Sequence, residues 1–472
     1  MRSLIVLAGY ALLCCWTASS ETYLVRPDGS GDFPTIQAAI DGASDGDTIL
    51  LASGVFSGDG NRDIDFVGKA ITVGSEAGHP DSCLLDCQGA YQNYHRGFHF
   101  TSDEGPGSII QGITIANGYV GPTSRGGGIY CETGTSPIIR DCVIRSCLAN
   151  DGGGIFAHEA TPAVEGCVIE ENEASSGGGI GIERGAVAAT NCTIERNIAW
   201  NRGGGVESYQ AEGSFEDCTI SDNYSDGKGG GFYFYQSYPV GSHYALINCT
   251  LVGNIAGDTG GGIRVHSSTA VEIVNTIVAF TIDGGAVRQE SDASVYLVCC
   301  DIYGNAGGDW VGPIAGYLGR FGNISLDPCF CDQESDDYHL WSYSPCDQAY
   351  CGLIGAWPVG CWSVQDSGYP ATQPSEMPGI VLQPSAPNPF SDATRIAFSI
   401  HETEAASSIA LIVCDAAGRI VRTLIPPALD AGMGTATWDG RDDSGRPVEA
   451  GAYFCRFSVG RETASRRVLL VR

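Results

Sequence analysis

The sequence predicts an all-β chain in which a long parallel β-helix precedes a small β-sandwich. The first observation is a motif of three glycines and an apolar residue, which recurs at steps of 26, 25, 26, 26, 31 and 24 residues. The second is a strand signature with the same period, whose copies begin at Cys142, Cys167, Cys192, Cys218, Cys249, Asn275 and Cys300. The glycine motifs begin at Gly126, Gly152, Gly177, Gly203, Gly229 and Gly260, with a diverged copy at Gly284. A fixed period in this range is typical of a solenoid.

Each repeat consists of short strands and turns. Residues 152–176, for example, alternate apolar and polar residues between turn residues and contain no helical stretch, as in half-buried strands. A unit of this size cannot bury its own apolar side chains, so neighbouring units must stack as parallel coils. We expect the glycines to provide turns with positive φ or close packing between coils.

An asparagine stands five residues after the strand signature in most repeats. The set is Asn172, Asn197, Asn223, Asn254 and Asn305. A column of asparagines at a turn predicts left-handed backbone geometry and stacked side-chain amides. We therefore interpret the column as structural, with ligand binding as the alternative.

Residues 21–60 predict an entry cap, which the first coil needs to cover its apolar end and free strand edges. The order is a strand at 23–25, a short helix N-capped by Thr35, and a strand at 47–51. This order resembles the start of pectin-lyase-like right-handed β-helices. The repeats, which pair Gly-Gly-Gly-Ile with Ile-x-x-Asn-x-Ala, resemble those of polymorphic outer-membrane proteins. Together the resemblances imply a right-handed, single-stranded parallel β-helix over 21–362, with regular repeats at 126–305 and a closing coil at 306–362. They are specific for fold and not for activity.

Residues 379–472 predict a second domain after a linker at 363–378 rich in Ser, Pro, Gly and Gln. Alternating runs at 396–400, 409–413 and 453–457 are separated by Gly- and Asp-containing turns, a spacing typical of a sandwich. The motifs at 388–390, 415–419, 438–442 and 451–454 resemble the Ig-like domain of flagellar hook-capping proteins and the sorting domains of type-nine secretion cargo. The resemblance implies an Ig-like domain for export and surface attachment.

Composition and the N-terminus bear on location and partners. The formal net charge is −30, and no basic stripe is present to neutralise phosphates, which excludes nucleic acid and anionic membranes as partners. Arg2, the apolar run 4–13 and the small residues 18–20 predict a signal peptide over 1–20. No later segment is long and apolar enough to span a membrane. We expect a monomer that is secreted or lies on the exterior of a bacterial outer membrane.

Cysteines fall into two groups. Those of the strand signature share one repeat position, so they should stack in a column as small buried side chains whose in-register geometry does not suit disulfides. Cys329, Cys331, Cys346, Cys351 and Cys361 lie outside the period and are the better disulfide candidates, with open pairing.

Two columns of residues are predicted to face outward, one and three positions after the apolar residue of each glycine motif. The first outward column is Tyr130, Phe156, Gly181, Glu207, Tyr233, Arg264 and Arg288. The second outward column is Glu132, His158, Glu183, Tyr209, Tyr235, His266 and Glu290. Aromatic rings beside carboxylates suit sugars, which offer apolar faces and hydroxyls. The candidate ligand-binding residues are Tyr130, Phe156, Glu207, Tyr209, Tyr233, Tyr235, Arg264 and His266.

The leading hypothesis is a non-catalytic, adhesin-like protein that binds glycans or partner surfaces on this face. It predicts one exposed strip containing Tyr130, Tyr209, Tyr233 and Tyr235. The alternatives are a polysaccharide lyase or glycoside hydrolase and a structural envelope spacer. The catalytic candidates are Glu132, His158 and Glu183, since the two glutamates stand two coils, about 9.6 Å, apart.

Metal-dependent catalysis has little support in the sequence. A calcium-binding Asp cluster with an Arg or Lys base, which the β-helix lyases use, is not evident on the repeats, and we expect no resident metal there. The Asp-rich segment with Asp327, Asp332, Asp336 and Asp337 is either a calcium site or a solvated turn.

Overall fold

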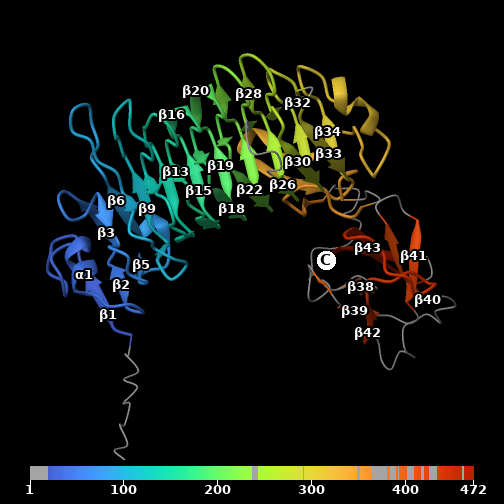
Figure 1. Cartoon of the computed structure of the whole chain (residues 1–472), viewed down its shortest axis with the longest axis horizontal. Helices are drawn as coiled ribbons and strands as arrows, with labels where there is room; N and C mark the ends of the chain where they lie inside the picture. The colour runs from blue at the N-terminus through green and yellow to red at the C-terminus, as the bar shows by residue number, and fades with distance from the viewer. Residues whose placement is uncertain are drawn as a thin grey trace, which may run out of the picture.

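The computed structural model describes residues 20–235, 243–290, 292–347, 351–362, 380–382, 390–391, 393–400, 409–415, 419–424, 433–459 and 462–471. Parallel strands stack coil upon coil from the N-terminal helix α1 onward (Figure 1). The predicted signal peptide lies outside the described residues except for its last position, and the predicted linker lies entirely outside them.

Three long parallel sheets form the sides of the coils. Sheet A contains β1 (Thr22–Val25), β2 (Thr48–Leu51), β5 (Thr72–Ser75), β8 (Ile109–Gln111), β11 (Ile138–Arg140), β14 (Ala163–Glu165), β18 (Ala186–Thr190), β22 (Glu212–Glu216), β26 (His243–Ile247), β30 (Ala270–Val274) and β33 (Ser294–Val298). Sheet B contains β3 (Gly54–Ser57), β6 (Cys83–Asp86), β9 (Thr114–Ala116), β12 (Val143–Arg145), β15 (Val168–Glu170), β19 (Thr193–Glu195), β23 (Thr219–Ser221), β27 (Thr250–Val252), β31 (Ile277–Ala279) and β34 (Asp301–Tyr303). Sheet C contains β4 (Ile64–Asp65), β7 (Phe98–Phe100), β10 (Ile129–Cys131), β13 (Ile155–His158), β17 (Ile180–Glu183), β21 (Val206–Tyr209), β25 (Phe232–Tyr235), β29 (Ile263–His266) and β32 (Val287–Gln289).

A short fourth sheet, sheet D, precedes the glycine motif in the regular coils. Its strands are β16 (Glu173–Ser176), β20 (Ile198–Arg202), β24 (Tyr224–Ser225) and β28 (Ile255–Ala256). The chain therefore runs through sheets C, A, B and D in each of these coils, and the glycine motif connects sheet D to sheet C.

Alternation along the strands builds one continuous core inside the coils. Ile144, Ile169 and Ile194 occupy one aligned position and are fully buried. The predicted cysteine column is confirmed: its members are buried free thiols, and Cys142 and Cys167 donate to main-chain carbonyl oxygens two residues earlier. Burial raises the pKa of the Cys167 thiol well above its ordinary value. These thiols therefore act as small core side chains.

Both predicted roles of the glycines, a turn with positive φ and close packing between coils, are confirmed. The first glycine of each motif has positive φ, for example +61° at Gly152. The second and third glycines lie against the next coil, since a Cβ on Gly153 would stand 2.5 Å from the carbonyl oxygen of Gly178. The motif thus permits both the turn from sheet D to sheet C and the close stacking of coils.

The asparagine column forms a buried ladder. Asn197 donates its main-chain N–H and its side-chain amide to Oδ1 of Asn223, at 3.1 and 3.0 Å, and Asn223 repeats both bonds to Asn254. The predicted amide stacking is confirmed, but the predicted left-handed backbone is wrong. The positive φ belongs to the preceding residue, for example Arg196 at +51°. Each asparagine turns inward, where its amide satisfies buried main-chain groups.

The entry cap contains helix α1 (Ile36–Gly42). Thr35 caps it by accepting a hydrogen bond from the N–H of Ala38, and its buried face is Ile36, Ala39 and Ile40, as predicted. A 3-10 turn, η1 (Pro80–Ser82), lies in the early coils. No helix within the described residues is long and apolar enough to cross a membrane.

The predicted closing coil at 306–362 divides into two parts. The 3-10 helix η2 (Gly312–Tyr317) lies next to β32 and β33, and buried Trp310 and Ile314 extend the core there. From β35 (Phe330–Asp332) the chain passes through η3 (Gln333–Ser335), β36 (Asp337–Trp341) and β37 (Val359–Cys361), which form a small separate sheet. This strap returns along sheet B instead of adding a coil.

Contacts along sheet B hold the strap. Its Ala356 N–H donates to Oγ1 of Thr250 at 2.9 Å, and the Trp357 indole donates to Oγ1 of Thr219 at 2.7 Å. Threonine hydroxyls on the outward face of two neighbouring coils thus receive donors from the strap.

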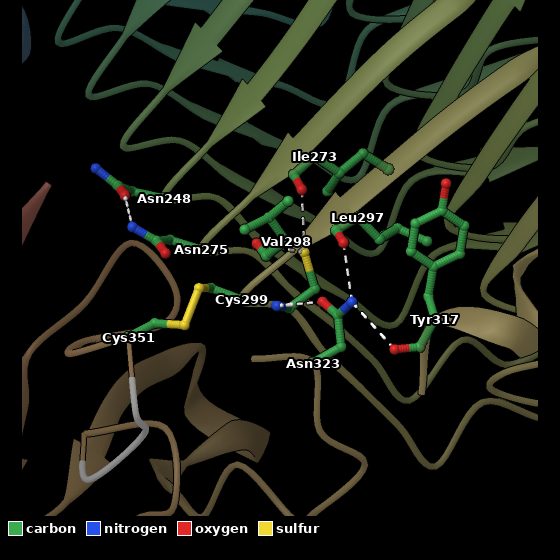
Figure 2. The surroundings of a disulfide bond; sticks show 10 residues. Asn248, Ile273, Asn275, Leu297, Val298, Cys299, Tyr317, Asn323 and Cys351 are labelled. Carbon is green, nitrogen blue, oxygen red and sulfur yellow. Dashed lines mark hydrogen bonds between the residues drawn. A yellow bond between two sulfur atoms is a disulfide. The ribbon is translucent and has the colours of Figure 1, made fainter. Parts of the chain in front are cut away.

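Disulfides fasten the strap. Cys331 pairs with Cys361, both predicted candidates, whereas Cys351 pairs with Cys299, which the sequence reading missed (Figure 2). Cys329 and Cys346 are free, contrary to expectation. Cys299 stands immediately before the strand signature at Cys300 and has positive φ (+56°), so its side chain points away from the core column.

The C-terminal domain contains two antiparallel sheets, as predicted. One contains β38 (Ile380–Leu382), β39 (Thr394–Ile400) and β42 (Met433–Trp438); the other contains β40 (Ile409–Asp415), β41 (Ile420–Leu424), β43 (Gly451–Val459) and β44 (Glu462–Leu470). Fully buried Trp438 contacts Tyr453 edge to face at 4.9 Å between ring centroids, joining the two sheets.

Candidate functional site

The register of sheet C aligns the two outward columns as predicted. Phe156 pairs with Gly181, Gly181 with Glu207, and Glu207 with Tyr233. His158, Glu183 and Tyr209 align in the same way and are partly exposed. The glycine motifs therefore identify correctly which side chains are neighbours across coils.

A third column, which the sequence reading missed, lies beside the first outward column. It consists of the residue before each glycine motif: Arg125, Asp151, Ser176, Arg202, Lys228, Thr259 and Asp283. The turn at the glycines brings this residue close to the first outward column, since a Cβ on Gly181 would stand 2.9 Å from the main-chain nitrogen of Gly152.

Arginines of the third column cover aromatic rings of the first outward column. The guanidinium of Arg125 lies 4.9 Å from the Phe156 ring centroid, and that of Arg202 lies 5.5 Å from the Tyr233 centroid. Cation–π contacts of this kind are attractive. They leave Phe156 only 2% and Tyr233 only 3% exposed.

The predicted exposed strip of tyrosines is therefore wrong. Tyr233 is buried beneath Arg202. The remaining rings form two separate groups: Tyr130 stacks on Phe156 at 6.2 Å, and Tyr209 stacks on Tyr235 at 5.4 Å. The coil that contains Gly181 separates the two groups.

A hollow of about 190 Å³ lies over this coil. Here the first outward column has Gly181 and the third column has Ser176, the smallest pair at these positions in the regular coils. Glu183, from the strand that contains Gly181, lines the hollow together with residues of the preceding and following coils, which are Arg125, Asp151, Phe156, Arg202, Glu207 and Tyr209. The hollow thus exists because two small residues coincide in one coil.

One wall of the hollow is an ion-paired cluster. Arg125 lies 3.3 Å from Asp151 and 2.6 Å from Glu183, and Glu183 also pairs with Arg184 at 2.8 Å. His158 Nδ1 lies 3.5 Å from Glu183. The sequence did not predict this ion-paired cluster, because Arg125 and Asp151 come from the overlooked third column.

Glu207 has a different environment from the other carboxyls. Its side chain is 7% exposed, and its nearest cation is Arg202 at 4.0 Å. Burial, assisted by Asp151 and Glu183, raises the pKa of Glu207 to about 7, while Arg202 acts in the opposite direction. A large fraction of Glu207 is therefore protonated at neutral pH.

The remaining predicted site residues lie outside the hollow. Tyr130 and Glu132 belong to the coil of β10, two coils before Gly181. Beyond Glu207, the Tyr235 ring contacts His266 at 5.0 Å, and buried Arg264 pairs with Glu290 at 2.5 Å. Burial, with Arg264 and Lys228, lowers the pKa of His266. Of the catalytic candidates, Glu183 and His158 lie within 3.5 Å of each other, and Glu132 belongs to the coil before His158.

Within the described residues, no group of three or more His, Cys, Asp and Glu side chains is arranged to hold a metal ion. Three aspartates of the strap instead have protein partners. Asp336 pairs with Arg196 at 3.2 Å, Asp337 with His339 at 2.7 Å, and Asp332 accepts from Ser335 at 2.8 Å.

Comparison with known proteins identifies the family. A model described as the right handed beta helix region matches residues 60–197 and 175–312, together more than half of the chain. The chain belongs to the right-handed β-helix family. This β-helix protein also contains an Ig-like domain of the FlgD type, matched at residues 385–463.

A solved structure shares the fold of the β-helix protein. The crystal structure of pectate lyase Pel9A aligns with a TM-score of 0.51 and 15% identity, over 72% of this chain and 97% of that chain. At this identity the likeness shows the fold alone. No curated protein matches the chain.

Proposed function

We propose that the protein binds polysaccharide chains along sheet C and holds one sugar ring in the hollow over Gly181. The observation that carries the proposal is the lining of the hollow, where the partly exposed Tyr209 ring stands beside arginines and carboxyls. Sugar rings present C–H faces to aromatic rings and hydroxyls to charged groups, so they match such a lining.

The neighbouring coils extend the proposed site in both directions. Tyr130 stacks next to Phe156 on one side, and Tyr235 with His266 follows Tyr209 on the other. Each coil advances by roughly 4.8 Å, so about one sugar unit fits each coil. A linear chain lying along the β-helix axis would contact all three places.

Export to the outside of the cell forms part of this proposal. The apolar N-terminal run and the FlgD-type Ig-like domain support it. Extracellular polysaccharide is then the class of ligand that the protein meets.

A polysaccharide lyase is the second candidate, supported by the likeness of the coils to pectate lyase Pel9A. Lyases release unsaturated sugars, which absorb ultraviolet light. Appearance of such products from a bound polysaccharide would favour this candidate over binding alone.

Retention of the full chain on immobilised polysaccharides tests the proposal. Polygalacturonate, alginate, xylan and amylose provide acidic and neutral probes. We expect Tyr209→Ala to weaken binding about tenfold, since it removes an aromatic face. Tyr296→Ala is the matched control, because Tyr296 is 54% exposed on sheet A. Failure of the wild type to bind any probe, or equal weakening by both variants, would refute the proposal.

A further inference from the structure

We propose that the hollow hydrolyses glycosidic bonds, with Glu207 as the general acid and Asp151 as the general base. This inference rests on the proposed polysaccharide binding and adds a reaction to it. It uses two carboxyls on opposite walls of the hollow, which come from coils on either side of Gly181.

Glu207 is a buried carboxyl directed at the hollow without a hydrogen-bond partner among the described residues. More than nine tenths of its side chain is buried, and its nearest cation, Arg202, stands 4.0 Å away. A buried carboxyl that accepts no hydrogen bond is more stable when protonated. Glu207 is therefore suited to donate a proton to a sugar oxygen near neutral pH.

Asp151 has one oxygen available. Its Oδ2 accepts from Nε of Arg125 at 3.3 Å and from Nδ2 of Asn150 at 3.0 Å. Its Oδ1 accepts no hydrogen bond from the described residues, and the ion pair keeps the side chain in place. This free oxygen is the one that we assign to water activation.

Glu183 is less suited to that role, although it lines the same hollow. Its Oε1 pairs with Arg184 at 2.8 Å and its Oε2 with Arg125 at 2.6 Å. Both oxygens are thus engaged. Glu183 instead acts as a positioning residue, because it holds Arg125, which in turn orients Asp151.

The spacing of the coils that carry the two carboxyls favours one stereochemical outcome. Asp151 and Glu207 belong to coils two steps apart, so their main chains are separated by roughly 10 Å along the axis. This main-chain separation is well above the roughly 5–5.5 Å between the carboxyls of retaining glycosidases and closer to the roughly 6.5–9.5 Å of inverting ones, which leave room for a water molecule. We therefore expect inversion at the anomeric carbon.

The reaction balances without a further reagent. Glu207 gives its proton to the bridging oxygen as the bond from that oxygen to the anomeric carbon breaks. A water oxygen bonds to the same carbon from the opposite face, and the water proton passes to Oδ1 of Asp151. The proton returns from Asp151 to Glu207 through solvent, which restores both groups.

The test incubates the full chain with each polysaccharide that it binds among polygalacturonate, alginate, xylan and amylose, and measures new reducing ends. We expect Glu207→Gln and Asp151→Asn to lose at least about a hundredfold in rate, while binding changes less than about threefold. Glu165→Gln, an exposed residue of sheet A, is the control and should keep full activity. Wild-type activity should fall as the pH rises through about 7, and proton NMR should show the inverted anomer first.

The outcomes separate the two claims. A polysaccharide that is bound but gives no reducing ends refutes the hydrolysis and leaves the proposed binding intact. Unsaturated products, a retained anomer, or full activity in Glu207→Gln also overturn the assignment. If the wild type binds none of the probes, the proposed function and this inference both fail.

Discussion

Replacement of Glu207 by glutamine should make the protein less sensitive to rising pH. The folded-state pKa of Glu207 is raised from 4.5 to about 7. Because the folded protein binds this proton more tightly than the unfolded chain, the group stabilises the fold fully below pH 4.5. That contribution is lost as the pH rises to about 7. At 1.36 kcal/mol per pKa unit, the loss between pH 5 and pH 8 is about 2–3 kcal/mol.

Urea unfolding of the full chain at pH 5, 6, 7 and 8, followed by tryptophan fluorescence, measures this difference. The free energy of unfolding of Glu207→Gln minus that of the wild type should rise by this amount from pH 5 to pH 8. Glu165→Gln, whose carboxyl is exposed, should track the wild type at every pH. Parallel curves for wild type and Glu207→Gln would refute the view that Glu207 is kept neutral by its surroundings, and with it the role of Glu207 as an acid.

Three further changes probe the scaffold. Asn223→Ala should lower the free energy of unfolding by about 3 kcal/mol, since it leaves the buried Asn197 N–H and Ile194 carbonyl without their partner. Exposed Asn201→Ala should have little effect in the same urea titration. Gly204→Ala should prevent soluble expression, because its Cβ would stand 2.5 Å from two carbonyl oxygens, whereas Gly213→Ala, with 3.4 Å to the nearest atom, should express normally. Loss of the Cys299–Cys351 disulfide, which spans 52 residues, should lower the free energy of unfolding by up to about 4 kcal/mol. Protease should then cleave the strap under conditions in which the wild type resists.

The coils could be predicted from the sequence because their register is locally encoded. The contact with the next coil requires glycine, the core column requires a small side chain such as cysteine, and the ladder requires the hydrogen bonds of asparagine. Each of these residue types therefore recurs in the sequence with the period of the coil. The alignment of Phe156, Gly181 and Glu207 followed directly from that period. The conformation of the asparagine turn could not be predicted, since asparagine suits both an inward-facing ladder position and a left-handed turn position.

The candidate site was predicted only in part. Its missing wall consists of residues before the glycines, which the turn from sheet D to sheet C folds against the outward columns. Reading one position before each motif would have found Arg125, Asp151 and Arg202 in one column, and Ser176 among them would have indicated the gap. The burial of Tyr233 could not be predicted in this way, because it depends on the path of the Arg202 side chain.

The two outward columns of sheet C and the third column before the glycines have a consequence for redesign. The positions that hold coils together, the glycines and the buried asparagines, are separate from the positions that touch a ligand. Each coil therefore offers three side chains that can be exchanged while its neighbours and its backbone stay the same. Placing a glycine and a serine at the equivalent positions of a neighbouring coil, and larger residues at Gly181 and Ser176, would move the hollow by one coil. The binding surface can therefore be redesigned one coil at a time.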